Sequence, residues 1–230
     1  MNIGFDVISD LYLKADDTFN WEGKATSLYC IIAGNISNDI KVIRQTLSHL
    51  GRFYQGIFYC LGSLEYEDCI DIPARTKELV KICNTQRNVA LLHHHVVIVE
   101  NIAVLGVNGW HGNTVPADPL TELQIEVARN EDIIYLTTSL ERLQRHLDVK
   151  SIILVSNSVP KTELYFGQIP DHIKNQIPID IALDADTETK ITHWVYGTND
   201  KVVDITMGYI SYINNSCYNK EPYWAKRIEI

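Results

Sequence analysis

The chain has no long apolar run, no paired cysteine motif and no surplus of basic residues. No stretch of about 18 apolar residues occurs among its 230 positions, so the sequence predicts no bilayer-spanning helix. Its five cysteines are odd in number and include no C-x-x-C pair, which favours reduced, buried thiols over a disulfide framework or a zinc site. The first residues lack a basic segment followed by an apolar one. We therefore expect no signal peptide and a cytoplasmic protein.

Basic residues are in the minority, with 20 Lys and Arg against 29 Asp and Glu, for a net charge of −9. Nucleic acids and anionic membranes both attract basic surfaces, so this balance argues against either as a partner. The phosphate-binding patterns G-x-G-x-x-G and G-x-x-x-x-G-K-[ST] are absent, and so is the G-x-S-x-G elbow of serine hydrolases. These absences remove the commonest nucleotide-binding loops and one large class of hydrolases.

Short apolar segments closed by glycine or polar residues predict strands that alternate with helices early in the chain and form hairpins later. We expect strands at residues 3–9, 28–33, 56–61, 96–99, 102–107, 152–155, 191–196, 201–205 and 208–213. We expect helices at residues 38–50, with Ser37 as the N-cap, at 74–83, and at 119–147 with a break near Asn130. No linker interrupts this pattern, so the sequence predicts one α/β domain over residues 1–230.

Polar residues follow five of the predicted strands, where ligands of α/β proteins commonly bind. The strand ends carry Ser9-Asp10-Leu11-Tyr12, Gly34-Asn35-Ile36-Ser37, Gly62-Ser63-Leu64-Glu65, Ser156-Asn157-Ser158-Val159-Pro160 and Gly197-Thr198-Asn199-Asp200. In this order the series resembles the calcineurin-like metallophosphoesterase family. The motifs of that family are D-x-H, G-D-x-x, G-N-H-[ED], a His before a small residue and Pro, and G-H-x-H. The resemblance extends over nearly the whole chain.

The resemblance implies a β-sandwich flanked by helices, in four α/β/β/α layers, and a pair of divalent ions that act on phosphate esters. Most of the residues that would hold those ions are replaced. Asp10 keeps the Asp of the first motif, whereas the remaining positions carry Tyr12, Asn35, Ser63, Leu64, Asn157, Thr198 and Asp200. Tyr12 stands where the family has the His of the first motif, and Asn35 where it has the bridging Asp. Ser63 and Leu64 stand where it has an Asn ligand and the catalytic His. Asn157 stands at the fourth-motif His, and Thr198 and Asp200 at the two last His.

These replacements remove the chemistry that the resemblance implies. Every imidazole ligand is absent, and the bridging carboxylate is the neutral amide of Asn35. Leu64 cannot donate a proton to a leaving alkoxide, so the general acid is missing too. We expect no cofactor at this site, although the oxygen atoms that remain could hold a single Mg²⁺ or Ca²⁺ weakly.

Three hypotheses follow for the function. The first is a pseudoenzyme that serves as a protein-binding or scaffold module. The second is an active metal-dependent phosphoesterase or nuclease with unconventional ligands, Asp10, Asn35, Asn157 and Asp200. The third is a small-ligand sensor whose cleft is lined by Tyr12, Asn35, Leu64 and Asn157. The first is favoured because seven of the eight motif positions are lost, while the strand-end glycines, Pro160 and the family-like stretch Gly106-Val107-Asn108-Gly109-Trp110 persist.

Two further groups of residues are candidate sites. The run from His93 to His95 has no Cys or carboxylate close in sequence, so we expect a solvated strand end rather than a metal site. Tyr and Trp residues are frequent toward the C-terminal end, for example Tyr218, Tyr223 and Trp224. Because these side chains anchor many protein interfaces, this end is a second candidate for a binding surface.

Overall fold

The structure, a computed structural model, describes residues 2–110, 119–165, 189–199, 201–218 and 223–230, with no side chains for 119–121. The strands are β1 Gly4–Ile8, β2 Tyr29–Ala33, β3 Gly56–Cys60, β4 Val89–Leu91, β5 Val96–Val99, β6 Ile102–Val107, β7 Ser151–Ser156, β8 Ile191–Tyr196, β9 Val203–Met207, β10 Ile210–Asn214 and β11 Lys226–Glu229. The α-helices are α1 Ile40–Leu50, α2 Ile72–Asn84 and α3 Pro119–Arg145. Two short 3₁₀ helices, η1 Leu64–Tyr66 and η2 Thr162–Leu164, follow β3 and β7.

The strands form two sheets that are largely parallel. The first has the order β11-β1-β2-β3-β4, in which β11 alone runs antiparallel to its neighbour. The second has the order β5-β6-β7-β8-β10-β9, with antiparallel pairing only at its two edges. Parallel strands covered on both faces are uniformly apolar, as β2 and β3 are. The α/β class predicted from the sequence is therefore confirmed.

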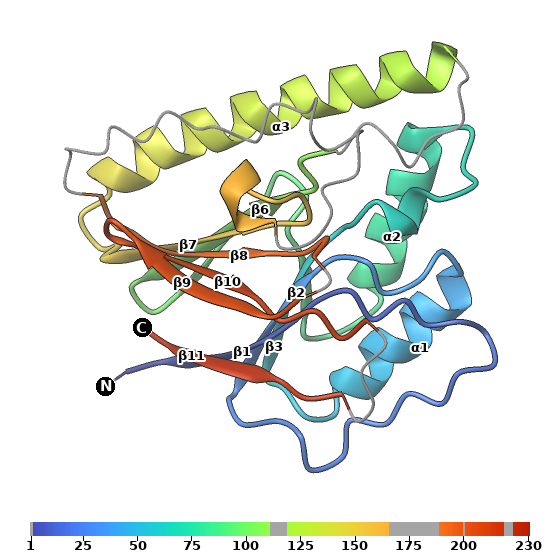
Figure 1. Cartoon of the computed structure of the whole chain (residues 1–230), viewed down its shortest axis with the longest axis horizontal. Coiled ribbons are helices and arrows are strands. Elements are labelled where there is room, and N and C mark those ends of the chain that lie inside the picture. Colours follow the sequence, from blue (N-terminus) through green and yellow to red (C-terminus); the bar gives the residue numbers. More distant parts are fainter. Residues whose placement is uncertain (1, 111–118, 166–188, 200, 219–222) are drawn as a thin grey trace.

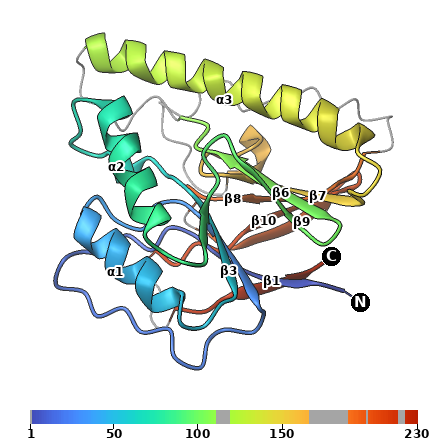
Figure 2. The same ribbon diagram turned by 180° about the vertical axis from the view of Figure 1, so that it is seen from behind.

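Three apolar cores hold the elements together. One lies between the two sheets, where Phe5 and Ile31 of the first sheet meet Val104 and Ile153 of the second. Another packs α1 and α2 against the first sheet, and a third packs the C-terminal half of α3 against the second. Figures 1 and 2 show the two sheets stacked, with α1 and α2 beside one and α3 across the other. Of the helices that the structure describes, none has the length and apolarity needed to cross a membrane.

Several local predictions differ from the structure. The N-cap of α1 is Asp39, whose Oδ1 accepts from the backbone N of Lys41 at 2.7 Å. Ser37 instead donates its hydroxyl to the carbonyl of Leu13 at 2.7 Å. The helix α3 runs without a break at Asn130. The sequence does not predict the strands β4 and β11. Each is short, and its extended conformation depends on pairing with a neighbouring strand more than on its own side-chain pattern.

Candidate functional site

The structure brings the predicted site residues together at one end of the sheets. Asp10 follows β1, Asn35 follows β2, and Asn157 follows β7. Hydrogen bonds connect these three loops to the residues after β3, Ser63 and Leu64, and to Thr198 after β8. Asp200, the last of the predicted positions, lies outside the described residues. The five strand ends thus meet as the parallel topology requires, because parallel strands share one carboxyl edge.

The backbone at these strand ends is sharply turned. Asp10, Tyr12, Asn35 and Thr198 have positive φ angles of 55°, 49°, 59° and 54°. Asp and Asn adopt this region several-fold more often than other side chains, whereas Tyr and Thr rarely do. Gly34 has φ of 78°, and a Cβ there would lie 2.6 Å from Asn157 Nδ2. A glycine is therefore required at this position for the loops after β2 and β7 to meet.

The Asn35 side chain is the centre of the cluster. Its Nδ2 donates to Asp10 Oδ1 at 2.8 Å and to the Tyr12 hydroxyl at 3.3 Å. Its Oδ1 accepts from the backbone N of Leu64 at 3.0 Å and from Ser63 Oγ at 3.5 Å. Two donors and two acceptors are all that an amide offers, so this side chain is fully occupied by the protein itself.

Asn157 and Thr198 complete the cluster from the second sheet. Asn157 Oδ1 accepts from the backbone N of Ser63 at 3.0 Å and from Thr198 Oγ1 at 3.1 Å. Its Nδ2 donates to the carbonyl of Ala33 at 3.2 Å. The backbone N of Thr198 donates to Asp10 Oδ1 at 3.0 Å. These bonds link the two sheets across their carboxyl ends and use polar atoms that would otherwise face a ligand.

Asp10 is the carboxylic acid at the centre of this cluster, and only 1% of its surface is exposed. Burial removes water from the charged form and raises the pKa of Asp10 to about 6, although hydrogen bonds from Asn35, Thr198 and Ser9 act in the opposite direction. The carboxyl is thus partly protonated near pH 6.

The donor set does not fit the pair of divalent ions that the sequence resemblance implies. Asp10 Oδ1 accepts two hydrogen bonds and Oδ2 accepts one from Ser9 Oγ at 2.8 Å. Among the described residues, no group of three or more His, Cys, Asp and Glu side chains converges. Amide and hydroxyl oxygens that already accept hydrogen bonds offer weak metal ligation at best. We derive no chemical step through a metal at this site.

Glu65, which was not among the predicted site residues, is a second buried centre of hydrogen bonds in these loops. Glu65 is fully buried and accepts hydrogen bonds from three backbone N–H groups and one hydroxyl. The donors are Ile36 N at 2.6 Å, Gly62 N at 2.7 Å, Tyr59 Oη at 2.8 Å and Asn35 N at 3.1 Å. Burial raises its pKa above the usual value. Glu65 matches the last, acidic position of the G-N-H-[ED] pattern, and this match could have identified it as a site residue from the sequence.

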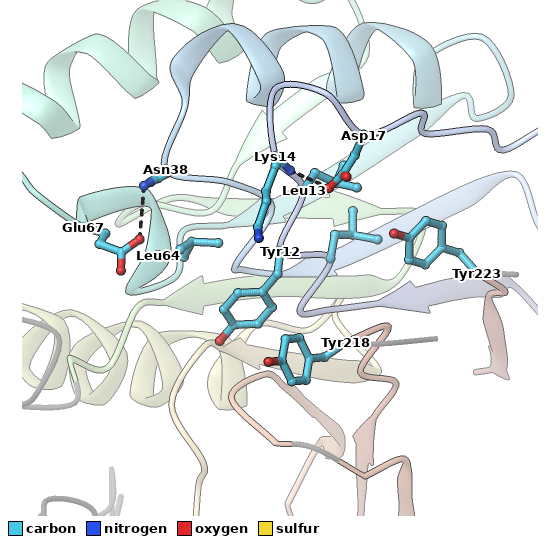
Figure 3. Close-up of a pocket in the computed structure, with 10 residues that line it drawn as sticks. Tyr12, Leu13, Lys14, Asp17, Asn38, Leu64, Glu67, Tyr218 and Tyr223 are labelled. Carbon is cyan, nitrogen blue, oxygen red and sulfur yellow. Dashed lines mark hydrogen bonds between the residues drawn. The ribbon is translucent and has the colours of Figure 1, made fainter. Parts of the chain in front are cut away.

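A cavity of about 840 Å³ opens beside the closed cluster. Figure 3 shows the side chains of Tyr12, Leu64, Lys14 and Tyr218 around it. The rings of Tyr12 and Tyr218 meet edge to face, with their centroids 5.0 Å apart. Tyr12 and Leu64 line this cavity as the sensor hypothesis requires, whereas Asn35 and Asn157 are fully buried and lie outside its lining.

Replacing Asp10 by Asn should stabilise the protein above pH 6. The raised pKa means that the folded state holds a proton which the unfolded state has released, so wild-type stability falls as the pH rises from about 4 to 6. An amide keeps the acceptor toward Asn35 and cannot ionise. The variant should therefore gain about 2–3 kcal/mol over wild type at pH 8 and almost nothing at pH 4, measured by urea unfolding.

The exposed Asp16, changed to Asn, is the matched control and should show no such pH dependence. Glu65 also has a raised pKa and acts in the same direction, but it is present in both proteins, so the difference curve isolates Asp10. A variant that is less stable than wild type at pH 8 would show that Asp10 is ionised and held by its hydrogen bonds.

No protein-family model matches the chain, and no curated protein matches it. Among solved structures, the phosphopantetheinyl hydrolase (PptH) from Mycobacterium tuberculosis aligns with 99% of this chain and 96% of its own, with a TM-score of 0.71. The fold resembles that of this hydrolase. The two sequences share 16% identity, so the likeness concerns the fold alone. A second solved structure aligns with 93% of this chain and 90% of its own, at a TM-score of 0.59 and 11% identity.

This result corrects the family that the strand-end motifs suggested. The structural likeness is to a phosphopantetheinyl hydrolase, and no family model supports assignment of the chain to the calcineurin-like metallophosphoesterases. Glycines and polar residues at strand ends are what any parallel sheet with tight loops needs. Their order alone therefore did not establish a family.

Proposed function

We propose that this chain is a non-catalytic binding protein, which uses the fold it shares with phosphopantetheinyl hydrolase as a scaffold for a protein partner. In this proposal the helix–sheet–sheet–helix layers form a rigid frame and no metal is resident. The five free cysteines stay reduced in the cytoplasm. The net charge of −9 argues against a nucleic-acid partner.

The observation that carries this proposal is the closed hydrogen-bond cluster around Asn35. Catalysis needs polar groups aimed at the position where a substrate changes charge, so those groups must be free to meet it. Here both ends of the Asn35 amide and both oxygens of Asp10 bond to neighbouring protein groups. Leu64 stands at the mouth of the cavity and has no proton to give. The cluster therefore supports a structural role.

The proposal is tested by assaying the purified protein for phosphoester hydrolysis with added Mn²⁺. The substrates are bis-p-nitrophenyl phosphate and, because of the fold likeness, a carrier protein that bears phosphopantetheine. We expect rates no different from the Asp10→Ala variant and no metal retained after dialysis, as measured by elemental analysis. Turnover that Asp10→Ala abolishes would contradict the proposal and favour a hydrolase with unconventional ligands.

The cavity beside the cluster favours a second candidate function, the binding of a small molecule without its conversion. At about 840 Å³ it falls within the range typical of ligand sites. Its wall combines the paired rings of Tyr12 and Tyr218 with the ammonium group of Lys14. Rings of this kind offer a flat, rigid surface for an aromatic or apolar ligand.

A metabolite screen by thermal shift separates the two functions. A ligand of this cavity should raise the melting temperature with concentration. The rise should be lost in Tyr218→Ala and kept in Tyr209→Ala, which changes an exposed tyrosine that does not line the cavity. A screen without hits, together with a stoichiometric protein complex recovered from native extract, would leave protein binding as the function.

A further inference from the structure

The N-terminal and middle turns of α3 expose a stripe of apolar side chains. Leu123, Val127 and Ile134 are 56%, 49% and 64% exposed. Their spacing of four and seven residues places them along one face of the helix. Scattered apolar residues are normal on a protein surface, but an aligned row on one helix is typical of a contact face.

The two halves of α3 pack against different cores, which leaves one face of the N-terminal half uncovered. The C-terminal half packs Leu136, Leu140 and Leu143 into the core of the second sheet. The N-terminal half instead places Ile125 in the core that lies under α1 and α2. In Figures 1 and 2 this half extends past the sheet toward α2. A groove therefore forms between α2 and the N-terminal half of α3.

This α2–α3 groove contains a cavity of about 420 Å³. Its apolar wall consists of Ile72, Pro73, Trp110, Leu123, Val127 and Ala128. Trp110 is held in place by its contact with Tyr66, at 4.6 Å between ring centroids. The backbone N of Ile72 donates to Gln124 Oε1 at 3.0 Å, which fixes α2 and α3 to each other. The cavity is thus preformed and large enough for one bulky apolar side chain.

The charges on the α3 side of the groove are mainly negative, whereas on α2 Arg75 lies 3.6 Å from Glu78 and Lys77 is exposed. Glu122, Glu126 and Glu131 are exposed on this half of α3, and Arg129 is its one basic residue. His93 lies in the wall of the groove, where burial lowers its pKa, so it adds little positive charge at neutral pH. A complementary surface would therefore be apolar in the middle and basic at its edges.

This charge pattern selects among possible occupants. A second copy of the chain that met the same face would bring two sets of these glutamates together, which costs free energy. An anionic membrane surface would be repelled in the same way. A helix with an apolar face and flanking Lys or Arg residues satisfies both the stripe and the glutamates.

We propose that the α2–α3 groove binds a basic amphipathic helix of a partner protein, with one large apolar side chain of that helix inserted against Trp110. This inference rests on the proposed protein-binding function and names the class of partner. The groove is formed by elements away from the Asn35 cluster, so binding there does not depend on what that cluster does.

A synthetic helical peptide of about 20 residues is the probe, long enough to form a helix on binding. It carries Leu and Phe at spacings of four and seven, with Lys at the flanking positions, and a fluorescein label. The control peptide has the same apolar residues with Glu in place of Lys. By fluorescence anisotropy, we expect the Lys peptide to bind about tenfold or more tightly than the Glu peptide and to weaken as salt rises.

Surface variants locate the binding site. Leu123→Glu and Val127→Glu should each weaken the Lys peptide about tenfold or more. Leu147→Glu makes the same change in charge at a residue that is 84% exposed beyond the end of α3, and it should leave binding unchanged. Glu126→Lys combined with Glu131→Lys should reverse the preference toward the Glu peptide. All four variants change exposed residues, and circular dichroism confirms that each is folded.

Each result has a defined meaning. Absence of binding by the Lys peptide, or binding that Leu123→Glu leaves unchanged, would overturn the proposal for this groove. Equal binding of both peptides would overturn the class of partner. A wild-type dimer in sedimentation experiments that Leu123→Glu dissociates would identify a second copy as the occupant, again against the proposal. The hydrolysis assay above is independent of these measurements, so failure here is distinguishable from failure of the proposed function.

Discussion

Replacing Glu65 by Ala should destabilise the protein by about 3–5 kcal/mol, the range found when a buried, hydrogen-bonded charged group is removed. The substitution leaves three backbone N–H groups, on Asn35, Ile36 and Gly62, without their acceptor inside the protein. It also leaves the buried Tyr59 hydroxyl without its partner. These groups belong to the loops after β2 and β3. Urea unfolding followed by far-UV circular dichroism measures the loss.

The control is Glu67→Ala, which removes the exposed glutamate directly after η1, where it accepts one surface hydrogen bond from Asn38 Nδ2 at 3.1 Å. This control should change stability by no more than about 0.5 kcal/mol. Glu65→Gln should fall between the two, because the amide keeps one acceptor oxygen while its NH₂ group faces a backbone donor. A Glu65→Ala protein as stable as Glu67→Ala would show that water replaces the carboxylate, and that the strand-end loops do not depend on it.

Replacing Asp6 by Ala should produce a loss of similar size, about 3–5 kcal/mol, at the other end of the first sheet. Asp6 is fully buried within β1. Its carboxylate accepts from the backbone N of Thr26 at 2.7 Å, from the Thr26 hydroxyl, and from the Tyr54 hydroxyl at 2.9 Å. The Tyr54 oxygen in turn accepts from Trp21 Nε1 at 2.8 Å. The substitution removes the acceptor on which this chain of bonds ends.

Thermal and urea unfolding measure the loss, and comparison of tryptophan fluorescence between Asp6→Ala and Asp6→Ala combined with Trp21→Phe isolates the signal of the loop that Asp6 holds. Tyr54→Phe is the graded variant, since it removes one hydroxyl and should cost about 1–2 kcal/mol. Asp16→Ala, at an exposed position, should have little effect. If Asp6→Ala unfolded at the same urea concentration as Asp16→Ala, the network would contribute specificity of structure rather than stability.

These two carboxylates and Asp10 show how the chain uses buried acids. Glu65 joins neighbouring strand-end loops, Asp6 anchors the long loop between β1 and β2, and Asp10 joins the two sheets through Asn35 and Thr198. Each lies among hydrogen-bond donors of the protein itself. Such networks rigidify a fold when every member is satisfied. A rigid frame of this kind suits a binding module, which gains affinity when its surface is preformed.

The sequence by itself determined the elements and where polar residues leave them. Short apolar runs predict buried strands such as β2 and β3, and apolar residues at helical spacing predict α1. The pattern works because the period of apolar side chains follows which face of an element is buried. The strand-end positions of Asp10, Asn35 and Asn157 followed from the same pattern. The structural role of these residues could not be predicted in the same way, because it depends on hydrogen-bond partners more than 20 positions away in the chain.

Tertiary structure alone decided the remaining features. His93 and His95 are exposed between β4 and β5, in line with the predicted solvated strand end, whereas α3 places Asp132 beside His94, with 2.8 Å between Nε2 and Oδ1. Glu65 accepts four hydrogen bonds because the loops after β2 and β3 and the Tyr59 side chain converge on it. The groove beside Trp110 exists because α3 extends past its sheet to α2. Contacts of this kind depend on how whole elements pack, and periodicity within one segment carries no information about its neighbours in space.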